Sequence, residues 1–286
     1  MRKDANVTKG ILYKCQKLSD YQEIDIIKIN EELGGKEKLF RNKNAFLGGN
    51  DNIKFEVFDL PRLITCPGST EICRKNCYQI KITNMHKGEN QDSASTYHKK
   101  YNLVCSMQDD FINRIVSEIK SKRPSDNRQN FIRIHADGDF YSEEYLIKWM
   151  TIALVTKLLF ENKYRFVVYT KSFRILDNVL SCNDKLRSIW ENACNIANIN
   201  EASVPNEISL ADFNLRIIAS VMDDTNIECE EIIKKYNLPR YIVTEIELDD
   251  MQTCGSDVCA DCLKCYQVYN SNNYAEMPDI KTKLRK

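Results

Sequence analysis

The sequence predicts an α/β protein built on a parallel β-sheet. Strand, loop and helix patterns alternate at least four times along the chain. The strand-like runs are nearly continuous in apolar residues, which is typical of parallel strands covered on both faces. Right-handed crossovers between such strands give either a partial β/α barrel or an open doubly wound sheet, and the pattern leaves both open. The runs span residues 55–58, 131–136, 165–170, 215–221 and 241–246.

Apolar periodicity and capping residues predict the helices between these strands. A long helix that begins at Ser93 or Ser95 carries its apolar face as far as Ile119. Ser142 is a good N-cap for a second helix that runs to about Phe160. Further helical patterns lie around Leu176, Val179 and Trp190, over residues 227–236 and, before the first strand, over residues 21–33.

The 286 residues are enough to bury a full core, and they divide into three predicted segments. Residues 1–50 form a polar extension, residues 51–248 form the β/α core, and residues 249–286 form a cysteine-rich segment. No run reaches the length of a membrane span, and the N-terminus lacks a secretory signal, so we expect a cytoplasmic protein without a membrane partner. In a reducing compartment, metal explains twelve cysteines better than disulfides do.

Three cysteines share an irregular loop directly after the first predicted strand. Six residues separate Cys66 from Cys73, and three separate Cys73 from Cys77. Pro67 and Gly68 keep the start of this loop from forming a regular element. Three thiolates on one loop are typical of an iron–sulfur cluster whose fourth iron is open to a ligand that is not protein. The sequence therefore predicts a [4Fe–4S] cluster on this loop.

Four more cysteines lie close together near the C-terminus, with gaps of four, two and two residues. The tight spacing of the last three is typical of ferredoxin-type cluster loops, whereas structural zinc usually takes two separated knuckles. A second [4Fe–4S] cluster, a structural zinc ion and cysteines shared with the first site all remain open. The segment would hold the C-terminal chain in place, or relay electrons if it binds iron. These cysteines are Cys254, Cys259, Cys262 and Cys265.

Polar residues collect where the predicted strands end. Residues 135–139, 170–172 and 220–224 each follow a strand, as the cysteine loop does. The loops after parallel strands meet at one edge of the sheet, and ligands bind at that edge. We therefore expect these loops to form one site.

Charge is distributed unevenly in a chain whose net charge is zero. Lys and Arg outnumber Asp and Glu in residues 74–133, and the reverse holds in residues 223–261. Solvated helix faces would explain both stretches. The alternative is that the basic stretch, residues 74–133, contacts a nucleic acid, a nucleotide substrate or another polyanion.

Several of these motifs resemble the gene product 88 family of bacteriophages and mobile elements. The resemblance covers about residues 45–268, implies an origin in a bacterial host cell and leaves the reaction open. The motifs are Leu60-Pro61, Thr65-Cys66-Pro67-Gly68, Cys73, Cys77-Tyr78, His135 with Gly138-Asp139-Phe140, and Tyr169-Thr170-Lys171-Ser172.

A more distant resemblance is to the radical S-adenosylmethionine (SAM) superfamily. Its members have a partial β/α barrel and a three-cysteine loop after the first strand that binds a [4Fe–4S] cluster. A Gly-Gly-Glu turn after the second strand holds the methionine amino group of SAM. Here Asp137-Gly138-Asp139 follows the second strand, and the cysteine intervals are six and three residues, where the superfamily has three and two. The resemblance implies a radical-SAM-type barrel that cleaves SAM and acts on a nucleotide, a nucleic acid or another macromolecule.

The same resemblance implies a SAM-binding role for polar residues at the strand ends. Asp139 would accept the methionine ammonium, and Lys171 or Ser172 would meet its carboxylate. Ser220 and Asp223 would contact the ribose or the substrate. The full set of predicted cofactor-binding residues is His135, Gly138, Asp139, Lys171, Ser172, Ser220 and Asp223.

Plainer roles and other functions remain open at this point. Asp139 would otherwise cap the helix that begins near Ser142, and His135 would be a hydrogen-bonded histidine packed inside the barrel. A non-catalytic iron–sulfur or zinc protein would bind nucleic acid or a host protein through the basic stretch. A metal-dependent hydrolase would use His135, Asp137 and Asp139, although thiolates suit soft metals and magnesium prefers oxygen. A radical SAM-like enzyme would need an electron donor as a partner.

Overall fold

The structure is a computed structural model of the whole chain. It describes residues 12, 17–22, 24, 38–42, 47–49, 51–77, 94–122, 127–199, 204–244, 259–266 and 280–283.

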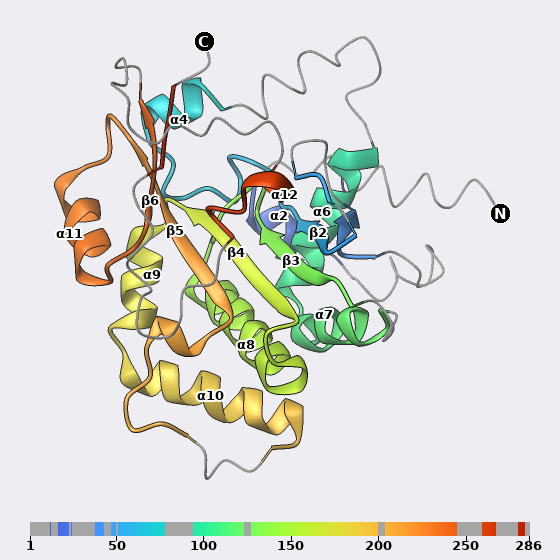
Figure 1. The fold of residues 1–286 in the computed structure, drawn as a ribbon. Helices are drawn as coiled ribbons and strands as arrows, with labels where there is room; N and C mark the ends of the chain where they lie inside the picture. Colours follow the sequence, from blue (N-terminus) through green and yellow to red (C-terminus); the bar gives the residue numbers. More distant parts are fainter. Residues whose placement is uncertain are drawn as a thin grey trace.

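A seven-stranded sheet runs through the described residues, and its strands follow the order of the sequence (Figure 1). Parallel pairings join β2 through β7 in succession, and β1 pairs with β2 in the antiparallel direction. A doubly wound sheet reverses its strand order at a switch point, and this sheet does not. The strands are β1 (Arg41–Asn42), β2 (Ile53–Phe58), β3 (Gln129–Ile134), β4 (Tyr164–Thr170), β5 (Leu215–Met222), β6 (Arg240–Thr244) and β7 (Ile280–Lys283).

The five predicted strands are confirmed as β2 to β6, with small differences at their ends. β3 ends at Ile134 rather than at residue 136, because His135 takes a left-handed backbone with φ of 62°. The end predicted for β6, residues 245–246, lies outside the described residues. The edge strands β1 and β7 were not predicted, since both are short and neither is a marked apolar run.

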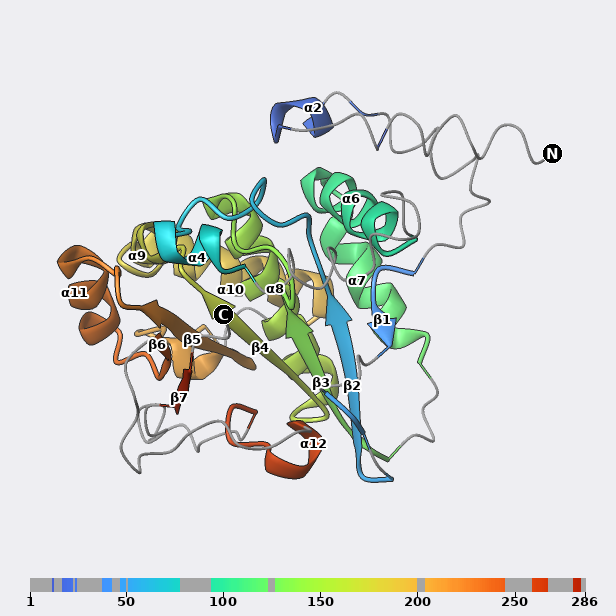
Figure 2. The same ribbon diagram turned by 90° about the horizontal axis from the view of Figure 1, so that it is seen from above.

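The helices between the strands cover one face of the sheet, and α12 lies against the other (Figure 2). Side chains from α6 to α11 belong to one large apolar cluster with the sheet, whereas α12 contributes to a second and smaller one. The helices that follow β1 are α4 (Glu71–Lys75), α6 (Ala94–Met107), α7 (Phe111–Lys120), α8 (Glu143–Phe160), α9 (Phe173–Leu180), α10 (Asn183–Ala197), α11 (Ile227–Lys235) and α12 (Cys259–Cys262), with a 3₁₀ turn η2 (Leu210–Asp212) before β5.

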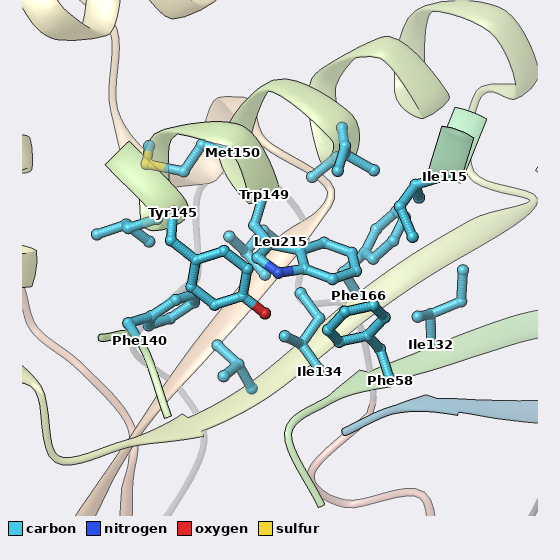
Figure 3. Close-up of a cluster of buried hydrophobic side chains, with 14 of the residues drawn as sticks. Phe58, Ile115, Ile132, Ile134, Phe140, Tyr145, Trp149, Met150, Phe166 and Leu215 are labelled. Atoms are coloured by element: carbon cyan, nitrogen blue, oxygen red, sulfur yellow. The ribbon is translucent and has the colours of Figure 1, made fainter. Parts of the chain in front are cut away.

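Helix α8 is the centre of the larger cluster, and it begins where the sequence predicts. The hydroxyl of Ser142 accepts a hydrogen bond from the amide of Tyr145 (3.2 Å) and caps the helix. Trp149 is fully buried, and its ring lies 5.1 Å from Phe58, 5.6 Å from Phe111 and 6.1 Å from Phe166 between ring centres (Figure 3). These contacts join α8 to β2, α7 and β4.

The single long helix predicted from Ser93 or Ser95 to Ile119 is wrong, because the chain forms α6 and α7 with a break at residues 108–110. Ser93 lies outside the described residues, and Ser95 lies within α6. The ammonium of Lys148, on α8, donates to the carbonyl oxygens of Ser106 (3.3 Å) and Gln108 (3.1 Å). These carbonyls end α6 and need donors from outside the helix, so α8 stabilises the break.

The predicted N-terminal helix over residues 21–33 is described only in part. The short helix α2 (Ser19–Gln22) reaches Tyr21, and its predicted continuation lies outside the described residues apart from Ile24. The fully buried ring of Tyr21 belongs to the larger apolar cluster. Part of the predicted N-terminal extension therefore packs against the core.

The opposite face of the sheet is partly covered by residues 259–266. Tyr266 is buried, with its ring edge-on to Phe55 (4.9 Å) and Phe131 (5.6 Å) between ring centres. The amide of Ala260 donates to the carbonyl of Leu47 (3.0 Å). The described residues 259–266 of the predicted cysteine-rich segment thus pack on the sheet. Within the described residues, no helix has the length and hydropathy to cross a membrane.

Replacing the central tryptophan tests the packing of α8. We expect Trp149→Ala to lower the free energy of unfolding by about 3–5 kcal/mol, because it removes a large buried side chain from the contact between helices and sheet. Ile227→Ala is the control, since Ile227 is 69% exposed, and it should change stability by no more than about 0.5 kcal/mol. Urea unfolding measures both. Equal stabilities would contradict the central place of Trp149.

Candidate functional site

The cysteine loop is hydrogen-bonded to the turn that follows β3. The amide of Leu60 donates to the carbonyl of Asp137 (2.9 Å), and the amide of Asp139 donates to the carbonyl of Thr65 (3.1 Å). The side chain of Thr65 bonds within the loop, to the carbonyl of Pro61 (2.8 Å). The pairing of β2 with β3 therefore continues beyond the strands and holds the first part of the loop in place.

Gly138 permits this close pairing. Its φ of +88° is unfavourable for residues with a side chain, and a Cβ atom there would lie 2.7 Å from both Leu60 Cβ and Thr65 Oγ1. Gly138, a predicted site residue, therefore allows the turn after β3 to pack directly against the cysteine loop.

Asp139 joins the turn after β3 to the end of β4. Its Oδ1 accepts from the hydroxyl of Thr170 (2.6 Å) and the amide of Phe140 (2.7 Å), and its Oδ2 accepts from the amide of Lys171 (2.8 Å). Only 6% of the residue is exposed, and burial raises the pKa of its carboxyl against the lowering effect of these donors. Asp139 is not the helix cap, because Ser142 caps α8 with its own hydroxyl.

The cysteine loop also lies directly against the turn that follows β4. A Cβ atom on Gly68 would be 2.0 Å from the carbonyl oxygen of Lys171 and 2.9 Å from the nitrogen of Ser172. Only glycine fits at this approach without moving backbone. The hydroxyl of Ser172 is buried at this contact and has no hydrogen-bond partner among the described residues.

Two further predicted residues meet beside the loop. The ammonium of Lys171 donates to the hydroxyl of Ser220, on β5, at 2.6 Å. Burial raises the pKa of the Cys73 thiol, and Lys171 lies near enough for its charge to oppose that rise. The strand ends of β4 and β5 therefore place a held cation next to the cysteine loop.

The loop after β5 contacts the cysteine loop through a residue that the sequence did not single out. Asp224 accepts from the amide of Ile72 through Oδ2 (2.8 Å), and the hydroxyl of Thr70 contacts the sulfur of Met222 (3.8 Å). Asp223, the predicted residue, is exposed. The sequence contains no signal that distinguishes two adjacent aspartates after a strand. The path of the backbone decides which of them contacts the cysteine loop.

The second part of the loop contains the short helix α4, which places two of the three cysteines. Thr70 is its N-cap, and its hydroxyl accepts from the amide of Cys73 (3.2 Å). The helix ends at Lys75, and Asn76 is its C-cap, with its amide bonded to the carbonyl of Ile72 (3.0 Å); Cys77 follows directly. Cys73 therefore lies inside a capped turn, and Cys77 lies just beyond it.

The three thiols of the loop are free and partly buried. Burial raises the pKa of Cys66, and the negative charge of Asp139 raises it further. Burial also raises the pKa of Cys73, while the cation of Lys171 lowers it. Cys73 lies within electrostatic range of both Cys66 and Cys77. A bound cation would favour their thiolate forms.

No set of three or more His, Cys, Asp and Glu side chains in the described part of the chain converges as the ligands of one metal ion do. Zn–S bonds of about 2.3 Å require thiolates about 4 Å apart around a single ion. A cubane binds its three thiolates on three different irons, which places them further apart. The described residues of the loop therefore do not match a site for a single metal ion, and the predicted cluster stays a prediction.

The proposed hydrolase ligands face different partners. The Nε2 atom of His135 lies 2.8 Å from the hydroxyl of Tyr145, and its ring packs edge-on against Phe140. The carboxylate of Asp137 bonds instead to the ammonium of Lys99 at 2.5 Å. His135 is buried, and burial lowers its pKa to about 3. The structure thus places His135 as a packed histidine and does not group these residues around an ion.

The basic stretch contributes most of its described cations to contacts within the protein. Lys99 pairs with Asp137 and Lys122 pairs with the buried carboxylate of Glu56. The ammonium of Lys100 donates to the carbonyl of Leu12 (2.8 Å). Arg74, Lys75 and Arg114 contact Ser69, Glu71 and Asp110. Six described cations of residues 74–133 thus have partners within the protein, and the predicted contact with a polyanion stays a prediction.

The second cysteine cluster is described only in part. Cys259 and Cys262 begin and end α12, and Cys265 follows in a turn that packs on the sheet. Cys254 lies outside the described residues. The metal predicted for this cluster therefore stays a prediction.

The comparisons with known proteins place the chain in one family. A family model described as Gene product 88 matches residues 28–268. The chain belongs to the gene product 88 family. The match covers β2 to β6, the cysteine loop and α12, so the site lies within the gene product 88 module. Neither the curated proteins nor the solved structures gave a match.

The approach of Gly68 to the backbone of Lys171 can be tested by adding one methyl group. We expect Gly68→Ala to displace the loop and to lower the free energy of unfolding by about 1–3 kcal/mol, because the Cβ atom meets a carbonyl that cannot rotate away. Ser69→Ala should be close to neutral, since the Ser69 hydroxyl makes only a long contact with Arg74 (3.4 Å). Thermal unfolding compares the two. A stable Gly68→Ala protein would show that the loop is not held there.

The burial of His135 predicts a specific pH dependence. Its pKa of about 3 in the folded protein lies below the unfolded value of about 6.5, so only the unfolded chain gains this proton as pH falls. Stability should therefore decrease below pH 6.5, by about 2 kcal/mol between pH 7 and pH 5. His135→Asn should remove this part of the dependence, since Asn tolerates the left-handed backbone and does not titrate. Urea unfolding at both pH values tests it, and equal pH dependence in the two proteins would contradict it.

Proposed function

We propose that this gene product 88 protein is an iron–sulfur enzyme of the radical SAM-like type. Cys66, Cys73 and Cys77 would hold a [4Fe–4S] cluster, and SAM would bind at its open iron. The observation that carries the proposal is the placement of the cysteine loop. Hydrogen bonds and close backbone contacts fix it over the carboxyl ends of β3, β4 and β5, where α/β proteins bind their ligands.

The donor set fits such a cluster. The loop offers three partly buried thiols, and Lys171 adds a cation near Cys73. A nearby cation stabilises the negative charge of a thiolate-bound cluster. Local charge and hydrogen bonding also set the reduction potential of the cluster. When bound, the cluster would supply one electron to the sulfonium of SAM.

The residues of the chain would bind and orient the SAM molecule. The ammonium of Lys171, held by Ser220, is suited to the methionine carboxylate, and the buried hydroxyl of Ser172 offers a donor beside it. Asp139 already accepts three hydrogen bonds from the protein, so we assign it to shaping the site rather than to holding the methionine ammonium.

The strand order supports the fold that the proposal implies, a partial β/α barrel of the radical SAM type. Successive parallel strands with helices on one face leave the other face for a substrate, and residues 259–266 cover part of that face. We propose that the C-terminal cysteines bind a second [4Fe–4S] cluster or zinc and fix this cover. The substrate would be a nucleotide, a nucleic acid or another macromolecule. The protein would act in the cytoplasm of a phage-infected bacterium, where an electron donor would reduce its cluster.

Iron content and SAM cleavage test the proposal directly. Protein reconstituted without oxygen should carry about four irons and four sulfides per chain, or about eight of each if the C-terminal cysteines also bind a cubane. With dithionite and SAM it should release methionine and 5′-deoxyadenosine. One electron breaks the carbon–sulfur bond, and the deoxyadenosyl fragment takes a hydrogen atom from the substrate or the medium.

Single cysteine variants locate the cluster. Cys66→Ser, Cys73→Ser and Cys77→Ser should each lose the iron of this loop and the cleavage of SAM. Cys229→Ser is the matched control, because Cys229 is a partly buried cysteine on α11 outside both cysteine sets. Zinc without iron in the wild-type protein, or iron unaffected by the loop variants, would reject the proposal.

A further inference from the structure

The segment between Cys66 and Cys73 is attached to the rest of the protein at two points besides the contact of Thr70 with Met222. Gly68 lies against the turn after β4, and Ile72 is hydrogen-bonded to Asp224 after β5. The first contact is a steric fit of backbone against backbone. The second is a directed bond between a charged acceptor and an amide, and bonds of this type are among the stronger hydrogen bonds in proteins.

Asp224 acts on the turn that carries Cys73. The amide of Ile72 is one of the amides at the start of α4 that have no acceptor within the helix, and Thr70 Oγ1 receives the amide of Cys73. Asp224 and Thr70 therefore accept hydrogen bonds from two of the amides in the first turn of a helix only five residues long. So short a helix is not stable alone, so its position depends on these contacts.

The side chain of Asp224 is itself well fixed. Asn226, two residues later, caps α11 through its own side chain, which accepts from the amide of Cys229 (2.9 Å). The hydroxyl of Thr225 accepts from the amide of Met222 (2.9 Å) and closes the turn after β5. The carboxylate of Asp224 therefore projects from an ordered turn.

We propose that Asp224 is a positioning residue for the iron–sulfur cluster: by holding the Ile72 amide, it sets where Cys73 presents its sulfur. This inference rests on the proposed function, because it assigns the cluster to the same loop. It predicts that loss of the carboxylate weakens the cluster without unfolding the protein, since Asp224 lies at the rim of the sheet and outside the apolar core.

Two variants and one control isolate the effect. Asp224→Ala removes the acceptor, and Asp224→Asn keeps an oxygen for the Ile72 amide but removes the charge. The control, Glu228→Gln on α11, removes a carboxylate from the exposed ion pair with Arg174 on α9. All three should keep the far-ultraviolet circular dichroism of the wild type. Loss of the visible absorbance of the reconstituted cluster in the presence of an iron chelator gives the rate of cluster release.

We expect release about tenfold faster in Asp224→Ala, a smaller increase in Asp224→Asn and wild-type release in Glu228→Gln. The electron paramagnetic resonance spectrum of the reduced cluster should also change in Asp224→Ala, because one ligand is less well placed. In iron-free protein, the Ile72 amide should exchange with deuterium faster in Asp224→Ala than in Glu228→Gln.

The results separate the two proposals. A wild-type protein that binds no iron overturns the proposed function and this inference with it. A wild-type protein that binds iron, with the same release rate and spectrum in Asp224→Ala, overturns the positioning role alone. Equal deuterium exchange of the Ile72 amide in Asp224→Ala and in Glu228→Gln would also overturn the positioning role, whether or not iron is bound.

Discussion

The arrangement of the site depends on one buried carboxylate. Asp139 receives three hydrogen bonds, one from its own turn and two from the end of β4. A buried carboxylate is costly unless donors compensate for lost water, so the charge and its donors hold one another in place. One of these donors is the Lys171 amide, and the carbonyl of the same residue is the surface on which Gly68 rests. The position of the cysteine loop thus follows from the position of Asp139.

Two glycines extend this constraint to the loop. Gly138 lets the turn after β3 pass within contact of Leu60 and Thr65, and Gly68 does the same between the loop and Lys171. In both cases a side chain would meet backbone or another fixed atom, and separation of the segments would break the hydrogen bonds beside them. The sheet therefore determines the path of an irregular loop through contacts that require the absence of a side chain.

Much of the fold could be predicted from periodicity, and less of the site could. The apolar runs and the Ser142 cap are local signals, and they located β2 to β6 and α8. The break between α6 and α7 is not local, because it depends on Lys148 from another helix. Predicting that strand-end loops gather at one edge required only parallel topology. Which oxygen or amide each side chain contacts depends on how the strands and loops are aligned in three dimensions. The sequence therefore did not predict that Asp139 links the turn after β3 to the end of β4, or that Asp224 bonds to the cysteine loop.

The unusual interval between the first two cysteines has a physical explanation in these contacts. The six residues from Pro67 to Ile72 are those that dock the loop: Gly68 meets the turn after β4, Thr70 caps α4, and Ile72 bonds to Asp224. A shorter interval would lose attachment points and would have to place Cys73 without the capped turn. The longer spacing thus supplies the loop with its own anchors on β4 and β5, so spacing alone does not argue against a cluster on these three cysteines.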